Sequence, residues 1–129
     1  MTIYALSSGP GMAGIAVIRV SGKNASKVIK MLSGKALPAP RVATLRKITK
    51  INTNELIDEA VIIWFPGPYS YTGEDMAEFH VHGSRAVIEE IHNSISKIRN
   101  CRMAEPGEFT KIAFQNGKIN LLKAESISD

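Results

Sequence analysis

Two charged residues stand in the middle of segments that have the pattern of β-strands, where an ion needs a partner. Arg19 lies within the β-branched run IAVIRV at Ile15–Val20, and Glu78 lies within MAEFHV at Met76–Val81. An ionised side chain is costly to bury alone, so each residue requires an opposite charge or a polar ligand. Two interpretations are open. Either Arg19 and Glu78 pair with each other, or both face a ligand: the carboxylate can accept two N–H groups of a guanidine-like ring edge, and the arginine can clamp an anion or a carbonyl.

Nearby histidines offer a second kind of chemistry. The segment from Met76 alternates in polarity, which predicts a strand with one apolar and one polar face. The apolar face would hold Ala77, Phe79 and Val81, and the other face Met76, Glu78, His80 and His82. Histidines at i and i+2 beside a carboxylate could begin a metal site together with His92, but spacing fixes no third ligand and no cysteine pair helps. Surface or hydrogen-bonding histidines are the favoured interpretation.

Three further features are weaker candidates for chemistry. The glycine-rich Gly9–Gly14 lacks the Gly-Lys-Ser/Thr ending of a P-loop and precedes a strand, so we interpret it as a backbone turn. Glu74 and Asp75 follow a glycine, a position where acids commonly close turns. Cys101 has two arginines within two residues that could lower the pKa of its thiol, although a buried or inert thiol is the default interpretation. Spacing reveals no catalytic triad or dyad, so no catalytic residue and no metal ligand is predicted.

Composition indicates a single globular domain, with at most a piece of a second. The chain has 129 residues, 44% of them hydrophobic, which is enough to build a core. No apolar run approaches the roughly 20 residues of a membrane helix, and the start lacks the pattern of a signal peptide. One cysteine fits a reducing compartment. We therefore expect a cytoplasmic protein that makes no use of a membrane.

The charge is distributed unevenly along the chain. Residues 1–54 hold nine of the sixteen bases and none of the twelve acids, so the two parts carry formal charges of +9 and −5. A basic half suggests an anionic partner, but it is equally compatible with two oppositely charged halves that face each other in one fold. The bases are scattered and no aromatic residues lie between them, so a nucleic-acid groove has little support.

Apolar periodicity predicts an α/β (α+β) fold, a mixed β-sheet with helices packed on it. The expected strands are 3–6, 15–20, 42–51, 57–65, 76–81 and 102–104. Three helices are expected. The first begins at Ser21-Gly22 and ends at Gly34, and the second begins at the cap Ser84. The third has Pro106 in its first turn and ends at Gly117. Asn120 would cap a further helix in which the chain stops, as expected of a piece of a longer protein.

Several sequence blocks carry a resemblance to a known family. They are Thr2-Ile3, the GxxGIAVIRVSG block at Gly11–Gly22, WFPGPYSYTGEDMAEFHVHG at Trp64–Gly83, and PGEFTKIAFQNGKINLLKAESISD at Pro106–Asp129. Their order and spacing resemble the N-terminal domain of the bacterial tRNA-modification GTPases of the MnmE (TrmE) family. The chain departs from the family pattern at three positions: Ser84, Glu105 and Ile112.

The resemblance implies a domain similar to the folate-binding modules of aminomethyltransferases. Such a domain would form a homodimer and bind a reduced folate, 5-formyltetrahydrofolate or a relative of it, near the dimer interface. The family positions that contact folate fall on Arg19, Glu78 and Lys118 of this chain. Two of these are the mid-strand charges that the residue pattern had already singled out.

The resemblance also implies how the chain is divided and what the whole protein does. Residues 1–118 would be the folate-binding and dimerisation domain, and 119–129 the beginning of a helical domain. A potassium-dependent GTPase, with its GTP and Mg²⁺, would be inserted there, outside this chain. The full protein would work with the flavoprotein MnmG (GidA) to place an aminomethyl-type group on C5 of wobble uridine 34 in tRNA. The alternatives are an oligomerisation scaffold with an incomplete folate site and, ranked last, direct tRNA binding through the basic half.

Overall fold

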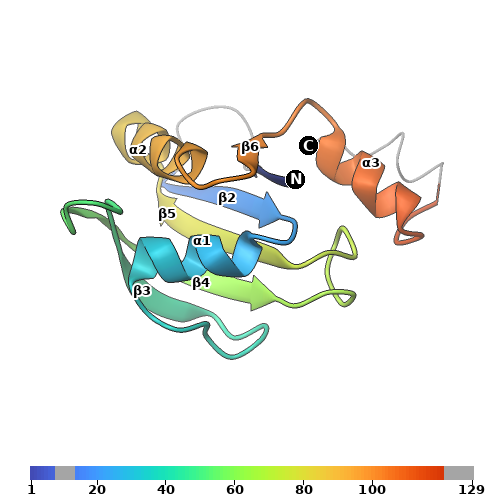
Figure 1. Ribbon diagram of the computed structural model, residues 1–129, viewed down its shortest axis with the longest axis horizontal. Coiled ribbons are helices and arrows are strands. Elements are labelled where there is room, and N and C mark those ends of the chain that lie inside the picture. The colour runs from blue at the N-terminus through green and yellow to red at the C-terminus, as the bar shows by residue number, and fades with distance from the viewer. Residues whose placement is uncertain (8–13, 121–129) are drawn as a thin grey trace.

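Six strands form one mixed sheet in the computed structural model, which describes residues 1–7 and 14–120 (Figure 1). The strands are β1 (Thr2–Leu6), β2 (Ile15–Ser21), β3 (Thr44–Thr49), β4 (Leu56–Phe65), β5 (Met76–His82) and β6 (Cys101–Met103). Their order is β3-β4-β5-β2-β1-β6, with β1 and β6 parallel and every other neighbouring pair antiparallel. The expected fold class is therefore confirmed, and β2 and β5 lie side by side at the centre of the sheet.

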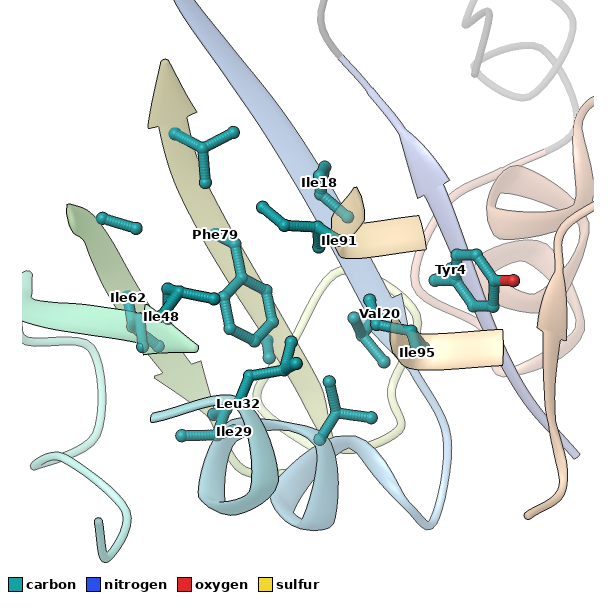
Figure 2. Packing of buried hydrophobic residues seen from close by; sticks show 14 of the residues in the cluster. Tyr4, Ile18, Val20, Ile29, Leu32, Ile48, Ile62, Phe79, Ile91 and Ile95 are labelled. Carbon is teal, nitrogen blue, oxygen red and sulfur yellow. The ribbon is translucent and has the colours of Figure 1, made fainter. Parts of the chain in front are cut away.

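Two helices cover one face of the sheet, α1 (Ala25–Ser33) and α2 (Arg85–Ser96). Figure 2 shows Ile29 and Leu32 of α1, and Ile91 and Ile95 of α2, directed toward strand residues such as Phe79. All five side chains are fully buried. Burial of a large aliphatic or aromatic side chain contributes about 1.5–3 kcal/mol, so this layer is the main source of stability. The apolar periodicity that predicted these two helices thus corresponds to their buried faces.

The third helix, α3 (Glu108–Gln115), packs against the opposite face of the sheet. Its Phe109 forms a small buried cluster with Ile3 of β1 and Met76 of β5. Ile3 and Met76 alternate with the core residues Tyr4 and Ala77, and they therefore point away from α1 and α2. This face is covered only in part.

In the described residues, no helix is long and apolar enough to cross a membrane.

The helix boundaries show where local sequence signals were sufficient. Gly34 closes α1 in the left-handed conformation with φ 67°, and Gly117 has φ 71° just after α3, as predicted. The start of α1 was predicted too early, because β2 runs through Ser21 and the residue that precedes the helix is Asn24. The glycine-rich turn 9–13 and the helix after Asn120 lie outside the described residues.

The start of α3 also differs from the prediction. Pro106 precedes the helix and is not in its first turn, and Gly107, with φ 74°, stands at the boundary. Glu108 opens the helix, and its Oε1 accepts hydrogen bonds from Arg102 Nη1 at 2.8 Å and from the backbone N–H of Glu105 at 2.9 Å. The hydrogen bond from Arg102 lowers the pKa of the Glu108 carboxyl. The first turn is therefore fixed by the pairing of Glu108 with Arg102 of β6.

Ser84 is confirmed as the N-cap of α2, and its replacement tests that role. The backbone N–H of Val87 donates to Ser84 Oγ at 3.1 Å. We expect Ser84→Ala to lower the free energy of unfolding by about 1 kcal/mol, because one backbone donor loses its partner. Urea denaturation measures the change. Ser84→Asp keeps an acceptor at the cap and should remain close to wild type; an equal loss in both variants would contradict the capping role.

Candidate functional site

Arg19 and Glu78 face each other across the central strands. Arg19 of β2 is directly opposite Glu78 of β5 in the antiparallel register, and its Nε donates to Glu78 Oε2 at 3.3 Å. Both residues alternate with core residues, and they therefore lie on the face opposite α1 and α2. Their side chains are 30% and 17% exposed. The pairing interpretation is confirmed, and the pair is still in contact with solvent.

Two further side chains complete what we call the Glu78 cluster, defined as Arg19, Tyr71, Glu78 and His80. His80 Nε2 lies 3.0 Å from Glu78 Oε1, so the two carboxylate oxygens have different partners. The Tyr71 ring stacks on Arg19, with 5.6 Å between the ring centroid and Cζ. The Tyr71 hydroxyl lies 3.2 Å from Thr110 Oγ1 of α3. The cluster thus draws on β2, β5 and the loop that precedes β5, and Thr110 connects it to α3.

The loop 66–75 is fixed over the end of β2 by its own polar side chains. Asp75 Oδ1 accepts a hydrogen bond from the backbone N–H of Gly67 at 2.8 Å and closes the loop. Ser21 Oγ lies 2.8 Å from Thr72 Oγ1 and 2.9 Å from Glu74 Oε1. Asp75 therefore has the turn-closing role that the sequence predicted, whereas the side chain of Glu74 connects the loop to β2.

Lys118 lies against the same loop, beside Gly73. It follows α3, its side chain is exposed, and its Cε would lie 3.2 Å from a Cβ added at Gly73. Asn116 Nδ2 donates to the Thr72 carbonyl at 2.7 Å and holds this turn against the loop. Two of the three expected site residues are thus in direct contact. The third adjoins the loop whose Tyr71 stacks on Arg19.

The three histidines lie in separate environments. His82 donates its backbone N–H to Asp58 Oδ2 at 2.8 Å, and its Nδ1 lies 2.6 Å from Oδ1 of the same carboxylate. His92 is on α2, on the other face of the sheet, with its ring 5.4 Å from that of Tyr4. Burial lowers the pKa of His92. Within residues 1–7 and 14–120, no three His, Cys, Asp or Glu side chains are grouped as a metal site requires.

Two hollows lie toward opposite ends of β2 and β5. The first, of about 160 Å³, is on the face of the Glu78 cluster; the second, of about 350 Å³, is beside the loop that Lys118 contacts. The first is lined by Ile15, Leu45, Glu59, Val61, His80, Val81 and His82, and the second by Gly22, Lys23, Gly67, Gly73, Glu74 and Asp75. Arg19 and Glu78 line neither hollow.

The charge asymmetry is only partly resolved by pairing within the chain. Of the nine bases in residues 1–54, Arg19 and Lys50 make ion pairs in the described structure, the latter with Glu55 at 3.1 Å and Glu90 at 3.8 Å. Lys27 and Lys30 are exposed on α1. Two bases of the first part of the chain, Arg19 and Lys50, are therefore paired with acids of the second part, as the interpretation of two facing halves expects.

Burial raises the pKa of the Cys101 thiol, in agreement with an inert cysteine.

Sequence reasoning missed Tyr71 and Asp58. Tyr71 lies in a turn-rich stretch with no periodicity, and only the folded loop brings its ring to Arg19. Asp58 lies near the start of the expected strand 57–65, where an acid would ordinarily be exposed. Only 9% of its side chain is exposed, and its carboxylate contacts His82. Two of the positions that depart from the family pattern have structural roles: Ser84 caps α2, and Ile112 packs against the small buried cluster of Ile3, Met76 and Phe109.

The comparison with sequence families gives one match that spans most of the chain. The family described as the N-terminus of the GTP-binding protein TrmE matches residues 2–118. This range includes Arg19, Glu78 and Lys118, together with all six strands and three helices of the described structure.

Curated relatives agree with this match. The chain is 76% identical over 129 residues to the tRNA modification GTPase MnmE of Pelagibacter ubique, which covers all of the chain and 29% of that protein. It is 48% and 46% identical to the mitochondrial 5-taurinomethyluridine-[tRNA] synthase subunits of Danio rerio and Homo sapiens, over 99% of the chain and 25% and 26% of those proteins. The chain therefore spans less than a third of the length of these relatives.

Proposed function

The chain belongs to the family of the TrmE N-terminal domain, and from that premise we propose that it binds a reduced folate at the Glu78 cluster. The single observation that carries the proposal is the Glu78 carboxylate, which stands on the open face of the sheet with a separate partner on each oxygen. A carboxylate held in this way is preorganised for a ligand that offers two parallel N–H donors.

The chemistry of a reduced folate matches such a site. Its pterin ring presents an N–H and an amino group side by side, as a guanidine does, and each carboxylate oxygen of Glu78 has lone pairs to accept them. Arg19 has five N–H donors, of which the contact with Glu78 uses the one on Nε, so the others can serve a carbonyl. Lys118, which lies beside Gly73 of the loop, would contact the ligand as a positive charge.

The activity of the whole protein is a second part of the proposal. The relatives' names describe tRNA modification GTPases and subunits of a tRNA-modifying synthase. We assign this chain the folate-binding and dimerisation part of such an enzyme in the cytoplasm. GTP, Mg²⁺ and K⁺ would bind in another domain, and the homodimer would act on tRNA together with MnmG. The one-carbon group for the uridine would come from the folate bound here.

The direct experiment is a calorimetric titration of the purified chain with 5-formyltetrahydrofolate. We expect saturable binding with a Kd in the micromolar range or below, about −8 kcal/mol or stronger. Absence of binding would contradict the folate proposal for this chain. Light scattering after size exclusion would then test the alternative of an oligomerisation scaffold, because a dimer that binds no folate is what that alternative predicts.

Lys118 can be tested in the same titration. We expect Lys118→Ala to weaken folate binding roughly ten-fold, because one charge-assisted contact is lost while the exposed side chain adds little to stability. Lys111→Ala is the matched control, since Lys111 is an exposed lysine of α3. Equal affinity of the two variants would remove Lys118 from the site.

A further inference from the structure

We propose that His80 is a positioning residue, which holds the Glu78 carboxylate in the orientation that a reduced folate requires. The inference rests on the proposed function and adds to it a residue outside the expected set Arg19, Glu78 and Lys118. The contact that carries it is the 3.0 Å separation between His80 Nε2 and Glu78 Oε1.

The direction of this hydrogen bond follows from chemistry. An ionised carboxylate can only accept hydrogen bonds, so His80 Nε2 must carry the proton and donate. The imidazole of His80 is therefore protonated at Nε2 whether or not the ring is charged. A neutral ring protonated only at Nδ1 would place two acceptors 3.0 Å apart and would separate the pair.

One partner alone would not fix the carboxylate. The terminal torsion of a glutamate side chain is broad, so a single bond from Arg19 to Oε2 leaves the carboxylate plane able to rotate. The donor at Oε1 is on the same strand as Glu78, two residues further on, and its side chain points to the same face. Rotation of the carboxylate away from this plane would break both bonds. His80 and Arg19 together thus define the directions from which a ligand can approach.

His82 provides a matched control on the same strand face. It is again two residues further along β5, but it contacts Asp58 and is 74% exposed, against 30% for His80. Both histidines line the smaller hollow. A general effect of removing a histidine from this face would therefore appear at both positions, whereas loss of the Glu78 orientation would appear only at His80.

The test is a titration of the whole chain and its variants with 5-formyltetrahydrofolate. We expect His80→Leu to weaken binding roughly ten-fold, the change that follows from loss of an oriented hydrogen bond to a charged group. His80→Gln retains an N–H donor of similar reach and should stay within about two-fold of wild type. His80→Asn is polar but too short to reach Glu78, and it should behave like His80→Leu. Rescue by glutamine alone separates positioning from a role in packing, and it covers the case in which the leucine variant does not fold.

The outcomes distinguish this inference from the proposed function. If wild type binds folate and the matched His82→Leu is unchanged, then wild-type affinity in His80→Leu and His80→Asn overturns the inference alone. If wild type does not bind, the proposed function fails and the inference fails with it. A readout without ligand is the long-range ¹H–¹⁵N spectrum of the imidazole, where we expect the Nε2-protonated form. A neutral ring protonated at Nδ1 overturns the inference.

Discussion

Replacement of Glu78 by alanine is expected to abolish binding of 5-formyltetrahydrofolate while the fold persists. The change removes the proposed acceptor for the pterin edge and also releases Arg19 and His80, which both bond to this carboxylate. We expect a loss of about 100-fold or more, since a doubly hydrogen-bonded carboxylate contact is lost and Arg19 is left without its partner. Calorimetric titration measures the affinity, and the far-ultraviolet circular dichroism of the variant reports the fold.

The effect on stability should be much smaller. Arg19 retains 30% exposure, so water can solvate the guanidinium once Glu78 is gone. For an ion pair that is open to solvent we expect about 1 kcal/mol or less of the free energy of unfolding. Glu59→Ala is the matched control, because Glu59 is an exposed carboxylate on the neighbouring strand and lines the smaller hollow. Wild-type affinity in Glu78→Ala would remove the central residue of the proposed site.

The site was predictable from sequence to the extent that it depends on alternation. A period of two placed Glu78 and His80 on the face opposite Phe79, and a mid-strand arginine marked Arg19. The register between β2 and β5 was not predictable, because it is set by the packing of side chains from segments 59 residues apart. The sequence therefore left two interpretations open, a pair between Arg19 and Glu78 or a ligand that both residues face. The antiparallel register of β2 and β5 shows the pair.

The missed features share a dependence on distant partners. Ser21 has the pattern of a helix start, but its hydroxyl bonds to Thr72 and Glu74, and β2 extends through it. Tyr71 carries no periodic signal, and its position over Arg19 arises from a loop closed by Asp75. Local rules describe capping and turn preferences, whereas these contacts are made by tertiary structure.

Gly22→Ala is expected to be the most destabilising single-methyl change in this part of the chain. Gly22 has φ 137°, and an added Cβ would lie 2.6 Å from Thr2 Oγ1 and 2.7 Å from Thr2 Cα. Backbone atoms cannot move aside as the end of a flexible side chain can, so β1 or the turn before α1 must shift. The backbone N–H of Gly22 also donates to the Asp75 carbonyl at 2.9 Å. We expect a loss of about 3 kcal/mol or more of the free energy of unfolding, a large part of the 5–15 kcal/mol typical of a domain.

Gly34→Ala separates the steric clash from the conformational cost. Gly34 also has a positive φ, 67°, but an added Cβ meets nothing within 4 Å. Its loss should be about 1 kcal/mol, the cost of a left-handed alanine. Urea denaturation of both variants gives the comparison, and equal losses would contradict the close approach of Thr2.

Because Gly22 directly follows β2 and bonds to the residue before β5, displacement there should also disturb the alignment of Arg19 with Glu78. Gly22→Ala should therefore weaken folate binding in the fraction that folds, whereas Gly34→Ala should leave it unchanged.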